Sequence, residues 1–278
     1  MTRIAFVTPA NLGTASLRYR AAIPAKYLRA KGYKVSIGPG VPDDATVCIF
    51  SKHFEDHRDK ARTAKKLGKR VIFDICDDHR QTEMRDYYAD MAKIAHVIVA
   101  STPMIAEAYK AKHVIPDPYE QPEKEPDFDR DQGLVWFGHK SNAQALIDVL
   151  PQINGYREML TVVSDISIPG IKCLPWTPNT QRAAMDAATI SIIPSAKPGA
   201  GANRMIESIR RGLFVVATPI DSYQEFRGGA WLGDIREGVE YALANKGTLA
   251  DKVSRAQKYV RLAYNPEAVG AMWERAVK

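Results

Sequence analysis

The chain has 278 residues, of which 45% are hydrophobic and 26% charged, the proportions of a soluble globular protein with room for two domains of ordinary size. No stretch approaches the roughly 20 apolar residues of a membrane span, and the apolar run at the N-terminus is too short for a signal peptide, so we expect a cytoplasmic protein. The three cysteines are widely spaced and neither a CxxC nor an HExxH pattern occurs, which argues against a structural or catalytic zinc.

The formal net charge of +7 is unevenly distributed. Residues 1–115 contain 20 Lys and Arg against 12 Asp and Glu, a net charge of +8, whereas residues 116–278 contain 19 against 20, a net charge of −1. A basic domain favours an acidic partner, such as nucleic acid, a phosphorylated polymer or an anionic membrane surface. A basic surface that only keeps the protein in solution explains the same excess equally well.

Strands and helices alternate along residues 1–115, which predicts a Rossmann-like domain. Short apolar runs predict strands at residues 3–8, 34–37, 46–50, 71–75, 96–100 and 113–115. Helices are expected at residues 17–30, 55–67, 83–94 and 102–110. Pro24 lies inside the first helix and predicts a kink or a later helix start. The helix at 55–67 is very basic, but it lacks the interleaved aromatic residues of base-stacking sites.

The strand at residues 71–75 runs directly into a polar sequence that contains Asp77, Asp78 and His79. Polar residues at the carboxyl end of a central strand are costly to bury unless they serve a functional site. These three residues are the best candidates for proton transfer or for binding a substrate hydroxyl, such as that of an acceptor, because a carboxylate or imidazole can take the proton of a hydroxyl. A metal site and simple helix capping by Asp78 are the alternatives.

Residues 116–132 contain four prolines among mostly acidic residues, which predicts a linker. After it, strands are expected at residues 133–137, 159–163, 171–174, 190–193 and 213–217. Helices are expected at residues 143–153, 179–187, 204–211, 234–244, 249–264 and 267–277, and residues 223–229 are expected to form a loop. This alternation predicts a second Rossmann-like domain.

Two loops of this second half have the composition of anion sites, one after the strand at 133–137 and one after the strand at 190–193. Gly138 follows the first strand and allows close approach of a ligand to the backbone, while His139 or Lys140 can neutralise phosphate. Ser141 or Asn142 serves there equally well as a plain helix cap. Neither GxGxxG nor GxxxxGK[ST] occurs, which excludes the standard dinucleotide fingerprint and the P-loop.

The most informative stretch is residues 190–225, ISIIPSAKPGAGANRMIESIRRGLFVVATPIDSYQEF. A strand ends at Pro194, a loop of small residues follows, Asn203 can cap a helix, and Gly212 fits its left-handed stop before the next strand. The loop therefore lies at the carboxyl end of a parallel strand and beside a helix N-terminus, where ligands and anions bind. Glu207 lies one turn into this helix, on the same side as Asn203.

This stretch resembles the donor-binding motif of GT-B glycosyltransferases, especially the large retaining family called glycosyltransferase group 1. The residues that match the motif are Pro194, Ser195, Glu207, Gly212, Val215 and Val216. The resemblance extends loosely over nearly the whole chain and implies an α/β protein with two Rossmann-like domains facing a cleft. Residues 1–115 would be the acceptor domain, 133–255 the nucleotide-sugar donor domain, and 256–278 helices that return to the first domain.

The resemblance also implies roles for individual residues. In that family the glutamate on this helix holds the ribose of a nucleotide sugar, a role that falls here to Glu207. The implied donor site further includes Gly138, His139, Lys140, Trp176, Ser195, Gly201, Ala202, Asn203 and Arg204. The loop expected at residues 223–229 would lie over the donor. The first loop and helix imply that Gly13, Ser16, Arg18 and Arg20 bind phosphate or acceptor, although surface arginines without such a role are at least as common.

One position departs from the family pattern. The family often has a first glutamate eight residues before the second, and this chain has Gly199 there. Asn203 and Arg204 can take over part of the contact with the sugar or phosphate. The departure puts the identity of the sugar in doubt.

The function expected from these observations is transfer of a sugar from a nucleotide sugar, such as UDP-glucose or another UDP-hexose, to a hydroxyl without a metal or other cofactor. Retention of configuration follows from the resemblance alone. The favoured acceptor is a hydroxymethylated base in double-stranded DNA, as in small phage-encoded glucosyltransferases, because the first domain is basic and the chain compact. A bacterial surface polysaccharide or lipid-linked sugar is the second acceptor. The alternatives are a non-catalytic module that binds nucleotide sugar or nucleic acid, which the glycine at position 199 suggests, and a sugar epimerase of similar architecture.

Overall fold

The computed structural model describes residues 2–8, 14–52, 56–130, 133–195 and 199–278. The chain forms two compact units, and each contains segments that are distant in sequence. The first unit consists of Met1–Pro118, Gly199–Gly201 and Ala263–Lys278, and the second of Tyr119–Pro198 and Ala202–Leu262.

A parallel six-stranded sheet forms the centre of the first unit, in the order β2-β1-β3-β4-β5-β6. Its strands are β1 (Arg3–Val7), β2 (Lys34–Gly38), β3 (Val47–Ser51), β4 (Arg70–Ile75), β5 (Val97–Ala100) and β6 (His113–Val114). The central strands are nearly continuous apolar runs, because a parallel sheet with helices on both faces buries side chains on both sides. All six strands were predicted from these runs.

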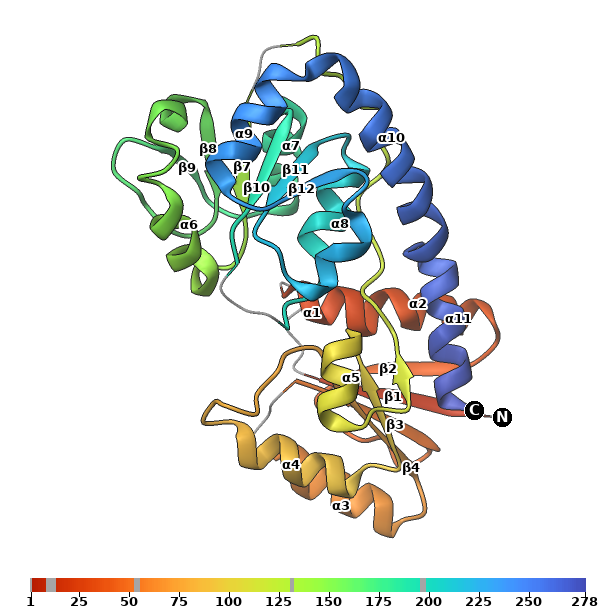
Figure 1. Ribbon diagram of the computed structural model, residues 1–278. Helices are drawn as coiled ribbons and strands as arrows, with labels where there is room; N and C mark the ends of the chain where they lie inside the picture. The colour runs from red at the N-terminus through yellow and green to blue at the C-terminus, as the bar shows by residue number, and fades with distance from the viewer. Residues whose placement is uncertain (1, 9–13, 53–55, 131–132, 196–198) are drawn as a thin grey trace. The chain divides into compact units, whose positions relative to one another are not determined.

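Helices cover both faces of this sheet (Figure 1). Successive side chains of a strand point to opposite faces, so Phe6 packs toward α2 and α11, whereas Val7 packs toward α3, α4 and α5. The helices of this unit are α1 (Ala15–Leu17), α2 (Ile23–Ala30), α3 (His57–Lys66), α4 (Arg85–Ile94), α5 (Pro103–Tyr109) and α11 (Pro266–Val277).

The kink expected at Pro24 takes the form of a π-helical turn. Residues Arg18–Ala22 form this turn between α1 and α2, and the Ile23 N–H donates to the Arg18 carbonyl five residues earlier. Proline has no N–H and its ring crowds the preceding turn, so a regular α-helix cannot continue through this position undisturbed.

The last helix, α11, completes the core of the first unit. Trp273 is fully buried and its ring meets Phe6 edge to face, with 5.8 Å between the ring centroids. Gly270 brings α11 into close contact with α2, because a Cβ atom at this position would lie only 2.2 Å from Tyr27 Cγ.

The second unit is built on another parallel six-stranded sheet, in the order β12-β11-β10-β7-β8-β9. Its strands are β7 (Leu134–Phe137), β8 (Leu160–Val163), β9 (Lys172–Leu174), β10 (Ile190–Ile193), β11 (Phe214–Ala217) and β12 (Ala230–Leu232). The edge strand β12 was not predicted, because a run of three residues gives too little pattern to recognise.

The helices of the second unit lie on both faces of its sheet. Trp136 and Ile192 pack toward α6, α9 and α10, whereas Val135 and Phe137 pack toward α7. The helices are α6 (Ala143–Val149), α7 (Pro178–Ala187), α8 (Asn203–Arg210), α9 (Ile235–Ala244) and α10 (Lys246–Ala263), with 3₁₀ helices η2 (Lys140–Asn142), η3 (Asn154–Met159) and η4 (Asp221–Phe226).

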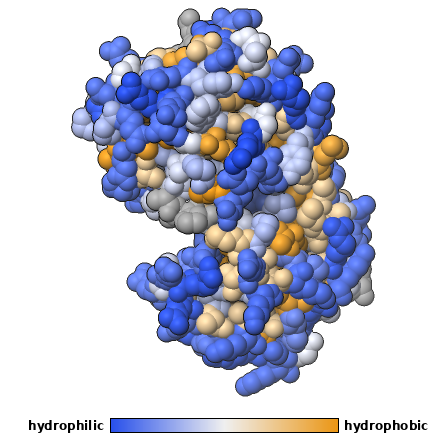
Figure 2. Space-filling view, in the orientation of Figure 1, coloured by the Kyte–Doolittle hydropathy of each residue, from blue (hydrophilic) through white to orange (hydrophobic). Residues whose placement is uncertain are grey.

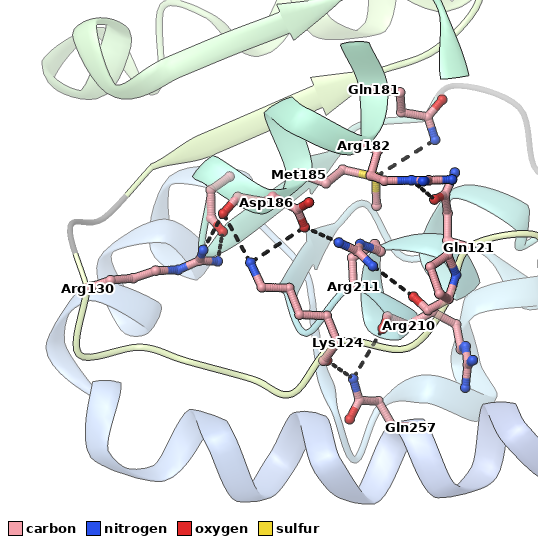
Figure 3. Close-up of polar contacts among 12 residues, drawn as sticks. Gln121, Lys124, Arg130, Gln181, Arg182, Met185, Asp186, Arg210, Arg211 and Gln257 are labelled. Carbon is pink, nitrogen blue, oxygen red and sulfur yellow. Dashed lines mark hydrogen bonds and ion pairs between the residues drawn. The ribbon is translucent and has the colours of Figure 1, made fainter. Parts of the chain in front are cut away.

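The chain enters the second unit through residues 119–130, called here the entering segment. This segment forms many polar contacts with the rest of the unit (Figure 3). Asp186 at the end of α7 forms ion pairs with Arg211 and with Lys124, the latter at 3.5 Å. Gln257 Nε2 on α10 donates to the Lys124 carbonyl at 2.8 Å, and Arg182 Nε donates to Gln121 Oε1 at 3.1 Å. The later part of the proline-rich segment is thus part of the second unit.

The visible face of each unit in Figure 2 is mostly hydrophilic. Within the described ranges, the large apolar side chains that are well exposed are Leu67, Val114, Ile147, Tyr259 and Leu262. A search of the same ranges finds no helix with both the length and the apolar character needed to cross a membrane.

Candidate functional site

Polar groups gather at the carboxyl ends of four adjacent strands of the second sheet, β11, β10, β7 and β8. Gly138 follows β7 and Ser164 follows β8. β10 leads through Ser195 to α8, and β11 leads to η4, which carries Tyr223. Open parallel sheets bind ligands at this edge, so the arrangement of the second unit favours a ligand site here.

Three of these polar groups are buried without a hydrogen-bond partner among the described residues: Ser164 Oγ, Arg204 Nη1 and the Tyr223 hydroxyl. Buried polar atoms in folded proteins are almost always paired, and the exceptions mark places where a ligand or water completes the structure. The Arg204 guanidinium can only donate hydrogen bonds, so a suitable ligand brings acceptor oxygens.

The N-terminus of α8 adds further donors to the same place. The residue before it, Ala202, has no side-chain group that could cap the helix. Asn203, predicted as the cap, is instead the first residue of the helix, and its side chain accepts from the Arg204 N–H at 2.7 Å. A Cβ atom on Gly138 would lie 3.4 Å from the Trp136 ring and 3.6 Å from Arg204 Nη1. These are ordinary contact distances, and they place the end of β7 next to Arg204 at the positive end of α8.

The two basic residues after Gly138 differ in their surroundings. His139 caps η2, because its Nδ1 accepts from the Ser141 N–H at 3.2 Å and lies 2.9 Å from Ser141 Oγ. Lys140 is exposed and has no ion-pair partner among the residues that the structure describes. Lys140 is therefore available for an anion, whereas His139 shapes the turn.

Trp176 is fixed by two hydrogen bonds after β9. Its indole Nε1 donates to Gln181 Oε1 at 2.8 Å, its backbone N–H donates to Asp165 Oδ1 at 3.2 Å, and its ring packs on the apolar cluster around α7. The fixed ring is compatible with the predicted wall of a base pocket, and that role stays a prediction.

Glu207, the predicted ribose ligand, is 2% exposed and bound to the backbone. Its carboxylate accepts from the Glu120 N–H at 2.6 Å and from the Gln121 N–H at 3.0 Å. These bonds give Glu207 a structural task in holding the entering segment, and its contact with a ribose stays a prediction. Ser195, Gly201 and Ala202 lie in or next to the loop before α8.

In the first unit, Gly13 lies outside the described residues, and Ser16 and Arg18 are partly buried in the first helix. Arg20 is 1% exposed, and its guanidinium donates to Asp74 at 2.6 Å and to Asp117 at 3.2 Å. Burial opposes the charge, but Asp74 and Asp117 outweigh it and hold the pKa of Arg20 above its ordinary value. This pairing favours a structural role for Arg20 over phosphate binding.

Asp77, Asp78 and His79 follow β4 directly, and each has a partner from the first unit. Their role in acceptor binding or proton transfer stays a prediction. Asp77 pairs with Lys52, and Asp78 pairs with Arg80 at 2.8 Å. His79 stacks on Tyr88 with 4.3 Å between the ring centroids.

These partners keep both carboxylates ionised. Burial acts to raise the pKa of Asp77, but the nearby Lys52 ammonium outweighs it and lowers the pKa, and hydrogen bonds from Arg80 lower the pKa of Asp78. An ionised carboxylate can accept a hydrogen bond from a hydroxyl, but a low pKa makes it a weak proton acceptor. The geometry thus suits positioning of a hydroxyl better than full proton removal.

Sequence reasoning placed Tyr223 in a loop over the donor without giving it a contact, and it did not select Lys52 or Arg80 as site residues. Lys52 has a φ of 64°, a backbone conformation that no sequence pattern signals for a lysine. Among the described residues, no group of three or more His, Cys, Asp and Glu side chains is arranged as metal ligands.

Comparisons at the level of sequence give no relative: no family model matches the chain, and no curated protein matches it significantly. Comparison with solved structures gives clear matches. HepE from Anabaena matches with a TM-score of 0.74 and 12% identity over 99% of both chains. Its structures were solved with UDP-glucose, with UDP and glucose, and with UDP.

Two further solved structures share the architecture. A Listeria monocytogenes protein assigned as a UDP-N-acetylglucosamine 2-epimerase has a TM-score of 0.62 and 10% identity over 99% of this chain and 95% of that one. MurG from Acinetobacter baumannii has a TM-score of 0.58 and 14% identity over 99% of both chains. The fold is therefore the predicted α/β fold of the GT-B type.

Proposed function

We propose that this protein is a glycosyltransferase that moves a sugar from a nucleotide sugar to a hydroxyl acceptor. The observation that carries the proposal is the edge of the second sheet that is rich in hydrogen-bond donors, where Gly138, Arg204 and the start of α8 meet. A nucleoside diphosphate offers acceptor oxygens to Arg204 and to the free N–H groups at the start of α8. The fold is also that of HepE, which was solved with UDP-glucose.

In the proposed reaction the bond between the sugar and the distal phosphate oxygen breaks, and a new bond forms from the sugar to the acceptor oxygen. The nucleoside diphosphate leaves with the electron pair of the broken bond, and its departing oxygen takes up the proton that the acceptor hydroxyl loses. Lys140, Arg204 and the positive end of α8 stabilise its negative charge, a task that a divalent metal performs in other transferases. Asp77 and Asp78 would hold the acceptor hydroxyl in the first unit.

The test begins with binding of UDP-, GDP-, ADP- and TDP-glucose, measured by thermal shift and titration calorimetry. A ligand at a free concentration of 100 times its dissociation constant should raise the free energy of unfolding by about 2.7 kcal/mol. Lys140→Met should weaken binding of the preferred ligand, and Lys172→Met, an exposed lysine of β9, is the matched control. Lack of binding by every nucleotide sugar would refute the proposal.

A second experiment separates transfer from epimerisation. Incubation with the preferred labelled donor and no acceptor should leave the sugar configuration unchanged, because a transferase needs an acceptor to complete its reaction. Conversion of the donor to its epimer without an acceptor would assign the chain to the epimerase class, which also has this fold. Binding without hydrolysis, transfer or epimerisation under all conditions would leave a non-catalytic module.

Two acceptor classes fit the proposal, double-stranded DNA with hydroxymethylated bases and a surface polysaccharide or lipid-linked sugar. The net charge of +8 over residues 1–115 favours DNA. Much of the charge on α3 is paired locally, however, and the pairs are Arg58 with Asp90, Lys60 with Asp56, and Arg62 with Asp59. Local pairing weakens the field that a DNA backbone would experience.

Salt dependence distinguishes the two acceptors. If DNA is the acceptor, its affinity should fall steeply between 50 and 200 mM salt, because bound cations are released from the duplex. Lack of any duplex binding at low salt would eliminate DNA and leave the carbohydrate acceptor.

A further inference from the structure

We infer that the Tyr223 hydroxyl belongs to the donor site, where it donates a hydrogen bond to an oxygen of the nucleotide's distal phosphate beside Arg204. The inference rests on the proposed function and assigns a specific contact within it. Tyr223 lies on η4 after β11, two strands away from Gly138 in the sheet order.

The position of Tyr223 is fixed by its surroundings. Its side chain is fully buried, and its backbone N–H donates to the Ile220 carbonyl at 3.0 Å. Phe226 of the same short helix is buried as well and packs edge to face on Tyr259, at 5.9 Å between the ring centroids. The phenol ring is thus fixed by packing on a short, well-anchored helix.

Within the described part of the chain, the proton of the Tyr223 hydroxyl has no acceptor, and the polar group beside it is the Arg204 guanidinium, which can only donate. Burial raises the pKa of Tyr223, and the Arg204 guanidinium, through its charge and by donating toward the phenol oxygen, opposes this only in part. The phenol therefore stays protonated at neutral pH and can act as a donor. Arg204 Nη1, buried and equally unmatched, is a second donor of fixed charge.

Two neighbouring donors without an acceptor define the chemistry of the missing partner. It must carry at least one acceptor atom, and an anionic oxygen suits Arg204 best because charge-assisted hydrogen bonds are the strongest. A phosphate supplies several such oxygens at once. A ribose hydroxyl or a base edge would leave the charge of Arg204 without a counter-ion.

The Tyr223 hydroxyl also lowers the stability of the protein when no ligand is bound. A buried hydroxyl without a partner loses its hydration and gains nothing in return. Removing this hydroxyl should therefore not destabilise the free protein, whereas it should weaken phosphate binding. A residue that only supports the fold would show the opposite pattern.

The experiment compares Tyr223→Phe with the wild type and with a control, Tyr241→Phe, whose hydroxyl in the same unit already has Lys252 as its partner. Titration calorimetry measures binding of UDP, GDP, ADP and TDP, and of the corresponding nucleosides. We expect Tyr223→Phe to lose about ten- to a hundred-fold in affinity for the preferred diphosphate. Its affinity for the nucleoside and its melting temperature without ligand should stay at or above the wild-type values.

Three outcomes would contradict the inference. Unchanged diphosphate affinity in Tyr223→Phe, with the wild type binding well, would overturn it and leave the proposed function standing. A lower melting temperature with parallel loss of nucleoside and diphosphate binding would show a purely structural role. If the wild type binds none of the diphosphates, the proposed function fails and the inference fails with it.

Discussion

Glu207 holds two backbone N–H groups of the segment that enters the second unit. Glu207→Ala would leave the buried N–H of Gln121 and the partly buried N–H of Glu120 without this acceptor, at a cost of about 1–3 kcal/mol each. We therefore expect a loss of about 2–5 kcal/mol in the free energy of unfolding, measured by urea denaturation without nucleotide. Glu158→Ala, at an exposed glutamate of the same unit, should change it by less than about 0.5 kcal/mol.

The same variant tests the ribose role of Glu207. If stability is unchanged and only UDP affinity falls, the structural role is wrong and the ribose contact is supported. If both fall, UDP binding measured well below the melting temperature of the variant separates the two contributions.

Lys52 lies in the left-handed backbone region, which costs a non-glycine residue on the order of 1 kcal/mol. In return its ammonium reaches Asp77 and lowers the pKa of that carboxyl against the opposing effect of burial. The stabilisation is present above the unfolded pKa of about 3.9 and is lost as the pH falls through the lower folded pKa.

Lys52→Met should therefore raise the pKa of Asp77, as measured by NMR titration of the side-chain carboxyl carbon. Arg62→Met removes a cation that pairs with Asp59 elsewhere in the unit, and should leave the titration of Asp77 unchanged. An Asp77 pKa that does not move in Lys52→Met would show that the pair contributes nothing to its ionisation.

At this scale the sequence predicted positions better than partners. Asp77, Asp78 and His79 were selected because polar residues end a buried strand, and the strand β4 does end just before them. Their partners come from distant segments, such as Lys52 at the end of β3, and depend on strand order and on one unusual backbone angle. For the same reason Arg20 could be recognised as an arginine of the first helix but not as the partner of Asp74.

At the scale of elements, the alternation of short apolar runs with amphipathic segments predicted both sheets and the fold class. Pro24 predicted the break that the π-helical turn provides. The edge strand β12 was missed because its three residues are only partly buried and lack a clear pattern. Boundaries set by packing, such as the later start of α4 at Arg85, also lie beyond local sequence.

Gly270 illustrates a packing constraint that sequence did not reveal. Gly270→Ala would place a Cβ atom 2.2 Å from Tyr27 Cγ, so α11 must shift away from α2. We expect a loss of about 1–3 kcal/mol in the free energy of unfolding of the first unit. Gly247→Ala in α10, where no atom lies within 4 Å of the new Cβ, should be neutral or stabilising by up to about 1 kcal/mol.

Urea denaturation of the two glycine variants checks this expectation, because both substitutions add one methyl group to a helix. Equal effects of the two would show that helix propensity dominates and that the contact between α11 and α2 is loose.

At the scale of the whole molecule, the first residues and the last ones share one core. Phe6 of β1, Arg20 of the first helix and Trp273 of α11 meet, and the Arg20 guanidinium lies 5.2 Å from the centroid of the Trp273 ring. The second unit is formed by the chain between them. The first unit therefore cannot complete its core until the C-terminal helix is made.

Trp273→Ala tests whether the two units unfold independently. The loss of the buried indole should cost the first unit about 3–5 kcal/mol, because it leaves a cavity beside Phe6 and Arg20. The second unit has its own sheet and core and should keep its stability. In hydrogen exchange, amides of β1 and β3 should become less protected, while those of β7 and β10 should stay as in the wild type. Equal loss of protection in both sheets would show that the chain unfolds as one cooperative structure.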